Sequence, residues 1–168
     1  VIECLSEEDL RDWQIDIVNM IKTKPDARKI FWYFDTVGGV GKSEFTRYLC
    51  LKHSAVLLGG KTADMKYGIL KYHEKKGRYP KLIIIDLPRS FKSEYLSYAG
   101  IEEVKNGMCF NTKSESDMVV FNRTHIIIFS NNGKPPLQRY IKFKIENGKI
   151  YFVSPDGQKN EMDRISEK

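Results

Sequence analysis

The sequence predicts an α/β domain in which a mainly parallel sheet is flanked by helices, with a β-hairpin near the C-terminus. Largely apolar runs at 30–34, 82–85 and 125–129, the last of which begins with His125, are typical of strands buried on both faces. Helical patterns separate these runs, as expected for parallel strands joined by crossover helices. The hairpin is predicted by Asn147-Gly148, a turn dipeptide between two alternating segments.

The first half of the chain predicts three helices and two strands. Leu10, Trp13, Ile17 and Ile21 have the spacing of one helix face, and residues 6–9 offer capping chemistry before it. The elements that follow are a strand at 30–34, a helix from 43 to about 52, a strand at 55–58 and a helix at 62–76.

The second half predicts one more helix, at about 92–105, and two hairpins. The first hairpin pairs 108–111 with 118–121 around a polar turn at 112–117. The second pairs 140–145 with 150–153. Buried strands at 82–85 and 125–129 lie between these elements and complete the sheet.

The composition limits the classes of function. Of 168 residues, 28 are basic and 22 are acidic, and this moderate excess of +6 is compatible with a nucleic-acid partner but common among soluble domains. No apolar stretch reaches the roughly 18 residues of a membrane span, so no membrane partner is expected. Three scattered cysteines favour reduced intracellular thiols, and the three histidines are equally scattered, so no metal site built from histidine is predicted.

A glycine-rich turn follows the strand at 30–34 and leads into a helix. Its sequence, Gly38-Gly39-Val40-Gly41-Lys42-Ser43-Glu44, is typical of the phosphate-binding loop of nucleoside triphosphatases. There, backbone N–H groups surround the phosphates, Lys42 reaches the β/γ oxygens and Ser43 binds Mg²⁺. Thr36 replaces the first glycine of the pattern, but the three later glycines still permit positive φ. The cofactors expected are ATP and Mg²⁺; the alternative is an ordinary glycine turn before a helix.

Two further polar residues follow predicted strands. Asp86 ends the strand at 82–85, where a Walker B aspartate holds the Mg²⁺ shell, and Asn131 follows the strand at 125–129, where an amide can contact the γ-phosphate. The carboxyl ends of parallel strands meet at one edge, so these residues and Lys42 are expected to lie together. Leu87 replaces the second carboxylate that many ATPases use, which leaves the catalytic base unassigned. The alternatives are an aspartate that only ends a strand and an asparagine that only forms a turn.

The order of these segments resembles the superfamily 3 helicase domain of replication-initiator (Rep) proteins from small circular single-stranded DNA viruses. The resemblance extends from about Leu10 to Ile145. Its motifs are Leu10-Arg-Asp-Trp-Gln14 in the entry helix, Arg28-Lys-Ile-Phe-Trp-Tyr-Phe-Asp35 before the phosphate loop, Ile85-Asp-Leu-Pro-Arg89 at Walker B, Ile101-Glu-Glu-Val-Lys-Asn-Gly107 at motif B′ and His125-Ile-Ile-Ile-Phe-Ser-Asn131 at motif C. Leu137-Gln-Arg-Tyr140 resembles a shortened arginine-finger segment.

The resemblance implies an AAA+-like P-loop fold and an ATP-dependent DNA helicase that acts in rolling-circle replication. It also implies a homo-oligomeric ring, a hexamer, around single-stranded DNA in the host nucleus. Arg139 would be the arginine finger, acting with Lys42, Asp86 and Asn131 in catalysis. Lys105 and Lys113, before and within the first hairpin, are expected to hold DNA phosphates; the alternative for Lys113 is a solvated turn lysine, and for Arg139 a surface arginine.

These expectations divide the chain into an N-terminal helical segment at 1–28, a P-loop ATPase domain at 29–155 and a loose tail at 156–168. The chain is expected to be the helicase portion of a longer initiator, because it has no His-x-His motif that would accompany a nuclease tyrosine. Two other functions stay open: a superfamily 3 RNA-virus ATPase acting on RNA, and a nucleotide-gated oligomerisation module with weak ATPase activity.

Overall fold

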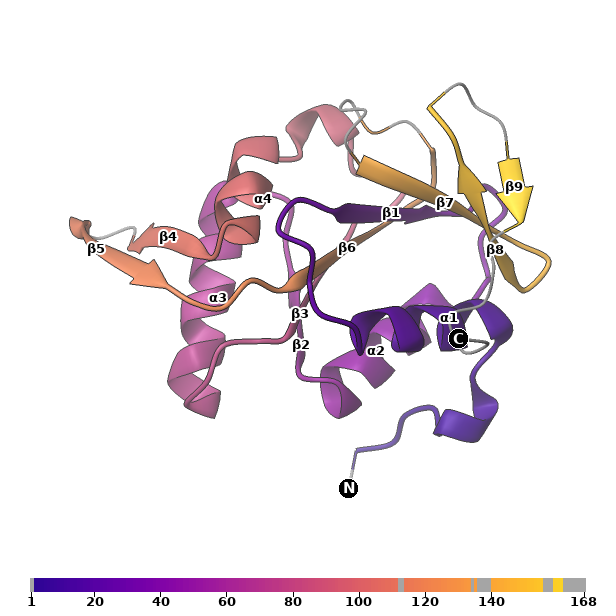
Figure 1. Cartoon of the computed structure of the whole chain (residues 1–168), viewed down its shortest axis with the longest axis horizontal. Coiled ribbons are helices and arrows are strands. Elements are labelled where there is room, and N and C mark those ends of the chain that lie inside the picture. Colours follow the sequence, from indigo (N-terminus) through magenta and orange to yellow (C-terminus); the bar gives the residue numbers. More distant parts are fainter. Residues whose placement is uncertain (1, 112–113, 134, 136–139, 156–158, 162–168) are drawn as a thin grey trace.

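The computed structural model has a central sheet with helices on both of its faces (Figure 1). It describes residues 2–111, 114–133, 135, 140–155 and 159–161. Within these ranges, no helix has the length and apolar character needed to cross a membrane. The three cysteines are free thiols.

The central sheet has seven strands, and five of them are parallel. In spatial order they are β2 (Ala55–Leu58), β3 (Leu82–Asp86), β6 (His125–Ser130), β1 (Ile30–Phe34), β7 (Tyr140–Glu146), β8 (Lys149–Val153) and β9 (Lys159–Glu161). The strands from β2 to β7 pair in parallel, and β8 and β9 extend the sheet in antiparallel pairs. The predicted α/β class with a mainly parallel sheet is therefore confirmed.

The C-terminal hairpin, β7–β8, is also confirmed. Its turn residues Asn147 and Gly148 have φ values of +52° and +77°. This left-handed backbone is the one that a two-residue turn between twisted strands requires, and asparagine and glycine adopt it most readily.

Each face of the sheet has its own core. Tyr33 of β1 packs on one face with side chains of α1 (Asp12–Ile21) and α2 (Lys42–Lys52). Trp32 packs on the other face with side chains of α3 (Thr62–Lys76) and α4 (Tyr98–Lys105). Successive strand residues point to opposite faces, so a continuous apolar run supplies both cores.

Three predicted boundaries were wrong for local reasons. Ser6 caps a separate 3₁₀ helix (Glu7–Asp9), with its Oγ 2.7 Å from Asp9 Oδ2, and α1 begins later. The helix expected at 92–105 is divided into a 3₁₀ helix (Ser93–Tyr95) and α4, because Ser97 is extended and its Oγ accepts the Gly100 N–H at 3.1 Å. The loose tail contains β9, where Lys159 Nζ lies 2.7 Å from Glu146 Oε1.

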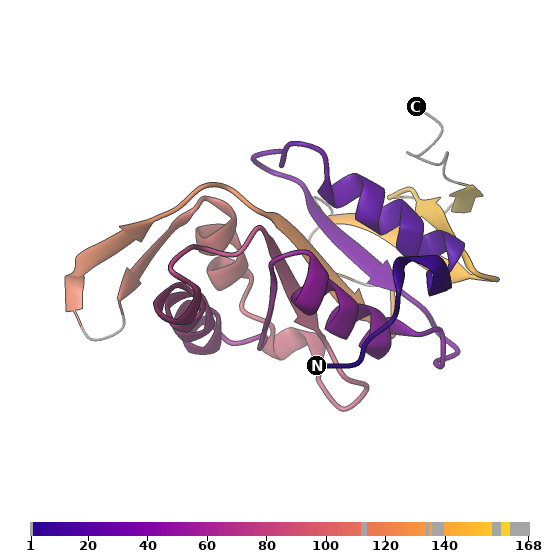
Figure 2. The ribbon, with the colours of Figure 1, turned by 90° about the horizontal axis from the view of Figure 1, so that it is seen from below.

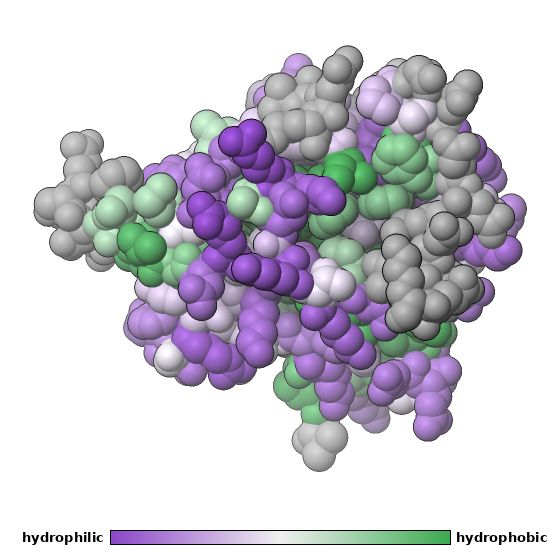
Figure 3. Space-filling view, in the orientation of Figure 1, coloured by the Kyte–Doolittle hydropathy of each residue, from purple (hydrophilic) through white to green (hydrophobic). Residues whose placement is uncertain are grey.

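A second, two-stranded sheet is formed by β4 (Met108–Asn111) and β5 (Ser114–Val120). This hairpin was predicted, but β5 begins at Ser114 and therefore includes most of the expected polar turn; backbone pairing does not require apolar side chains. Figures 1 and 2 show the hairpin projecting from the body of the molecule beyond α3 and α4. Met108, Met118 and Val120 are exposed on it, and Figure 3 shows this apolar surface.

Candidate functional site

The candidate site lies at the carboxyl edge of the parallel strands. The glycine loop, defined here as residues 36–41, connects the end of β1 to the start of α2. In the sheet register, Phe34 of β1 lies beside Ser130 of β6, and Phe129 of β6 lies beside Asp86 of β3. The ends of β1, β3 and β6 are therefore neighbours, as the sequence predicted.

The glycine loop has the backbone that its glycines were predicted to allow. Gly38, Gly39 and Gly41 have φ values of +87°, +69° and +97°. A side chain is strained in this region, so the loop depends on glycine at these positions. Thr36, which replaces the first glycine of the motif, is exposed and has no positive φ. The departure from the motif therefore falls at a position where glycine is not required here.

Lys42, the first residue of α2, extends to the ends of β1 and β6. Its Nζ donates a hydrogen bond to the Ser130 carbonyl at 3.0 Å and to Asn131 Oδ1 at 3.4 Å. It also lies 2.5 Å from Asp35 Oδ1. The structure thus joins Lys42 and Asn131, two of the predicted site residues, through a direct contact.

Asp35 is a site residue for which sequence reasoning gave no role. Its side chain is buried, with 1% of its surface exposed, and its second oxygen accepts the Gly38 N–H at 2.5 Å. It therefore links Lys42 to the glycine loop. The signal was present in the sequence, because Asp35 follows a buried strand in the same way that Asp86 does.

Three other side chains bind carbonyl groups of the loop. Arg89 Nη2 donates to the Val37 carbonyl at 3.2 Å, Arg11 Nη1 donates to the Val40 carbonyl, and Gln14 Nε2 donates to the Gly41 carbonyl at 3.4 Å. All peptide bonds in the loop are trans, so the C=O and the N–H of one peptide unit point in opposite directions. The N–H of the residue that follows each of these carbonyl groups therefore points away from the side chain that the carbonyl binds.

The N–H groups of Gly41 and Lys42 are therefore directed away from Arg11 and Gln14. Two exposed arginines also bring positive charge close to the loop. N–H groups at a helix N-terminus, with cations beside them, form a suitable environment for an anion. The sequence had assigned no role to Arg11 or Arg89, although both lie in segments that resemble motifs of the family.

Asp86 ends β3 and is half-buried. Burial raises the pKa of its carboxyl above the usual value, and the nearby Lys42 ammonium opposes this shift. The next residue, Leu87, is buried, and its N–H donates to the Phe129 carbonyl at 2.8 Å. The position at which many ATPases have a second carboxylate therefore belongs to the core.

Asn131 is held in place by the turn in which it lies. Trp32 Nε1 donates to the Asn132 carbonyl at 2.7 Å, and Lys142 Nζ donates to the Gly133 carbonyl at 3.2 Å. Gly133 also lies against the ring of Phe34, which an added Cβ would approach to 2.6 Å. The amide of Asn131 is thus positioned by side chains of β1 and β7.

The remaining predicted residues have different outcomes. Ser43 and Glu44 are exposed in the first turn of α2. Lys105 is buried, with 1% of its surface exposed, and its Nζ donates to the Thr124 carbonyl at 2.8 Å, so the expected contact with DNA phosphates is not available to it. Lys113 and Arg139 lie outside the described residues.

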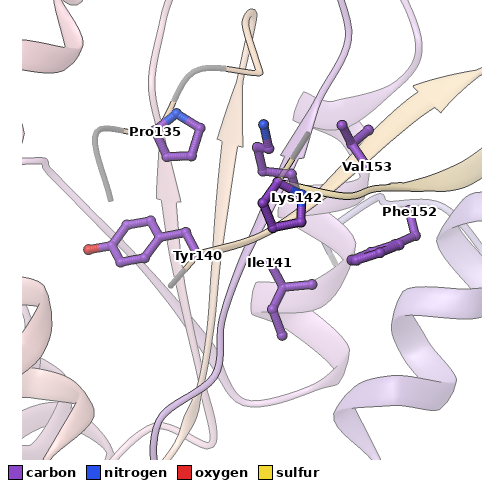
Figure 4. Close-up of a pocket in the computed structure, with 7 residues that line it drawn as sticks. Pro135, Tyr140, Ile141, Lys142, Phe152 and Val153 are labelled. Atoms are coloured by element: carbon purple, nitrogen blue, oxygen red, sulfur yellow. The ribbon is translucent and has the colours of Figure 1, made fainter. Parts of the chain in front are cut away.

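A small cavity of about 160 Å³ lies on β7 and β8 (Figure 4). Tyr140, Ile141 and Lys142 contribute from β7, and Phe152 and Val153 contribute from β8. No residue of the glycine loop lines it, so we assign no part of the candidate site to this cavity.

Comparison with known proteins finds relatives with a consistent description. The chain is 39% identical over 126 residues to Para-Rep C10 of Milk vetch dwarf C10 alphasatellite. This aligned region covers 73% of this chain and 42% of that protein. It is 39% identical over 133 residues to Para-Rep C6 of Subterranean clover stunt C6 alphasatellite, which covers 76% and 44%. It is 32% identical over 120 residues to the master replication protein of Subterranean clover stunt virus (strain F), which covers 71% and 38%.

No family model matches the chain, and no solved structure matches it at a significant level. The aligned regions cover less than half the length of these relatives. Across most of its own length, the chain is homologous to replication (Rep) proteins of alphasatellites and circular single-stranded DNA viruses.

Proposed function

We propose that this chain is the ATP-driven motor portion of a replication initiator. In this proposal it binds ATP and Mg²⁺ at the glycine loop and uses hydrolysis to move along single-stranded DNA as a homo-oligomeric ring. The observation that carries the proposal is the contact of Lys42 with Asn131 at the carboxyl edge, beside a loop with three left-handed glycines. Homology to Rep proteins supports the connection to replication.

The residues fit a nucleoside triphosphate with magnesium. The backbone N–H groups of Gly41 and Lys42 would bind phosphate oxygens, and Lys42 would neutralise part of their charge. Ser43 and Asp86 would hold the metal ion, which supplies charge neutralisation for phosphoryl transfer. Asn131 would hydrogen-bond the terminal phosphate or the attacking water. Burial raises the pKa of Asp86, and a nearby divalent cation would favour its charged form.

A nucleotide-gated oligomerisation module is the second candidate, and one observation favours it. Leu87 is buried in the core, so the carboxylate that orients water in many ATPases is missing at this position. Such a module would bind ATP and assemble, but it would turn ATP over slowly. In both candidates Arg139 would act from a neighbouring subunit, and Lys113 would contact DNA from the hairpin.

The test is steady-state ATP hydrolysis by the purified chain, without polynucleotide and with single-stranded DNA or RNA of equal length. The motor proposal expects DNA to stimulate hydrolysis more than RNA does, and Lys42→Ala to abolish it. ATP-dependent assembly with no stimulated hydrolysis would support the module instead. Wild-type nucleotide affinity in Lys42→Ala would remove the glycine loop from both candidates.

A further inference from the structure

The edge of the sheet opposite the glycine loop is strongly basic. It is formed by the segments at the amino ends of the strands, residues 22–29, 52–54, 75–81 and 122–124, which we call the basic edge. These segments hold 10 of the 28 basic residues and one of the 22 acidic residues. The rest of the chain has 18 basic and 21 acidic residues, so the positive excess of the whole protein comes from this edge.

The segment from α1 to β1 crosses the front of the molecule in Figure 1, and Figure 3 shows strongly hydrophilic residues over it. Asp26 is the one acidic residue of the basic edge. The Arg28 N–H donates to the Asp26 carboxylate at 2.8 Å, and this hydrogen bond is the main cause of a lowered Asp26 pKa. This carboxylate is therefore occupied by its own loop.

The basic edge contains a cavity of about 640 Å³. Arg78, Lys81 and Arg123 line it and are exposed, so their charges are available to solvent and to a ligand. A second hollow of about 370 Å³ shares Ile21 and Lys81 with it and adds Lys22 and Lys52. Together the two hollows form a basic groove of the size that a nucleotide requires.

Aromatic rings border the same cavity. His73 stacks on Tyr79 with ring centroids 4.2 Å apart, and Tyr79 stacks on Phe121 at 5.1 Å. His73 is exposed at the outer end of this row. Aromatic rings beside a basic groove are the arrangement that binds single-stranded nucleic acid, because an unpaired base can stack while cations hold the backbone.

A buried acceptor lies in the cavity wall. His125 lines the cavity with 4% of its surface exposed, and its Nε2 lies 2.7 Å from the Thr23 carbonyl. A carbonyl accepts only, so Nε2 carries the proton and Nδ1 is an acceptor. Nδ1 is buried and has no hydrogen-bond partner among the residues that the structure describes. Burial lowers the pKa of His125, which keeps the ring neutral. An N–H group of a nucleobase, such as N3–H of thymine, is a donor suited to this atom.

We propose that the basic edge binds single-stranded DNA, with phosphates on Arg78, Lys81 and Arg123 and a base in the cavity near His73 and His125. The inference rests on the proposed function for the choice of DNA as the polymer, but it requires no ATP turnover. An unpaired base is favoured over a duplex because only an unpaired base exposes a face to His73. An acidic peptide would use the cations but not the aromatic row.

The test measures binding of a labelled oligo-dT to the whole chain by fluorescence anisotropy, without nucleotide and over a range of salt concentrations. The triple variant Arg78→Ala/Lys81→Ala/Arg123→Ala should lower the log–log salt slope by about 2, since each phosphate contact on a single strand contributes about 0.7. The matched control is Lys61→Ala/Lys92→Ala/Lys149→Ala, which removes the same charge from exposed positions elsewhere and should leave the slope nearly unchanged. Thermal melting checks that both variants fold.

His73→Ala separates base stacking from charge. We expect it to weaken oligo-dT binding by about 5-fold or more with an unchanged salt slope, because stacking of one base contributes about 1–3 kcal/mol. Lys42→Ala should bind the oligonucleotide like the wild type, so a failure of the ATPase proposal would leave this result intact. Equal losses in the two triple variants, no effect of His73→Ala, or tighter binding of duplex DNA or RNA would each overturn the proposal.

Discussion

Asp35→Asn tests how the buried carboxylate controls the glycine loop. The side chain keeps its shape and an oxygen that can accept the Gly38 N–H, but it loses its charge. Lys42 Nζ lies 2.5 Å from the carboxylate in the structure described here. A phosphate bound to the same Nζ would therefore meet a negative charge on the opposite side of the ammonium group.

The size of this repulsion follows from the geometry. A phosphate oxygen in contact with the other side of Nζ would lie about 5–6 Å from the Asp35 carboxylate, the sum of two such contacts. Two unit charges at this separation repel by about 3 kcal/mol at an effective dielectric constant of 20, and by about 0.7 kcal/mol at that of water. We therefore expect Asp35→Asn to bind nucleotide about 3- to 150-fold more tightly. The folded state should lose stability, because Lys42 loses its counter-ion.

The assay is a titration with a fluorescent ADP analogue, combined with thermal melting. Glu103→Gln is the matched control: it removes a carboxylate from an ion pair with Lys66, 3.2 Å apart, that joins α4 to α3. The control should leave nucleotide affinity unchanged. Equal or weaker binding by Asp35→Asn would refute the reasoning and would show that Asp35 holds Lys42 ready for the phosphate rather than competing with it.

Three further predictions concern Asp86, Lys105 and Arg139. Because burial raises the pKa of Asp86, protonation of this carboxyl stabilises the folded protein, and this stability is lost as pH rises through the raised pKa. At pH 7 without metal, the uncharged variant Asp86→Asn should therefore melt at a higher temperature than the wild type. The same variant should show no Mg²⁺-dependent hydrolysis. Unchanged hydrolysis would contradict the metal role. Lys105→Ala should lower the free energy of unfolding by about 2–4 kcal/mol by leaving a buried carbonyl and a void, with unchanged oligonucleotide affinity. If Lys105→Ala lost DNA binding but kept wild-type stability, the original expectation that Lys105 contacts DNA would be supported. Arg139→Ala should depress hydrolysis by about 10³-fold, and mixing it with inactive Lys42→Ala should recover activity at mixed interfaces. Rings that form but recover nothing would exclude an arginine finger.

The fold could be predicted because its strands are buried on both faces. A run such as Ile126-Ile-Ile-Phe129 has one plausible environment, and the Asn147-Gly148 turn has a specific backbone requirement. The exact starts of helices depend on single hydrogen bonds. Ser97 caps α4, and no periodicity in the sequence distinguishes this serine from its neighbours.

Site residues could be predicted where a sequence motif and a strand end indicate the same position. They were missed where their place in the site depends on contacts between segments that are distant in the sequence. Lys42 and Asn131 follow from a motif and a strand end, and the structure brings them together. Arg11, the residue before α1, contacts the loop across 29 residues of sequence, and sequence spacing does not reveal such a contact. Lys105 showed the opposite problem: the sequence suggests an exposed lysine at the end of a helix beside a hairpin, but in the fold its side chain is buried and bonds to the segment before β6.

Strand β6 begins at the cavity of the basic edge, with His125, and ends at Ser130, whose carbonyl binds Lys42. Six residues of extended chain span about 17–20 Å, and this strand is buried throughout. A single rigid element thus forms part of both proposed ligand sites. Any effect of bound DNA on ATP affinity must then be matched by an equal effect of ATP on DNA affinity, since linkage between two equilibria is reciprocal. Two binding curves for each ligand, with and without the other, would measure this coupling in both directions.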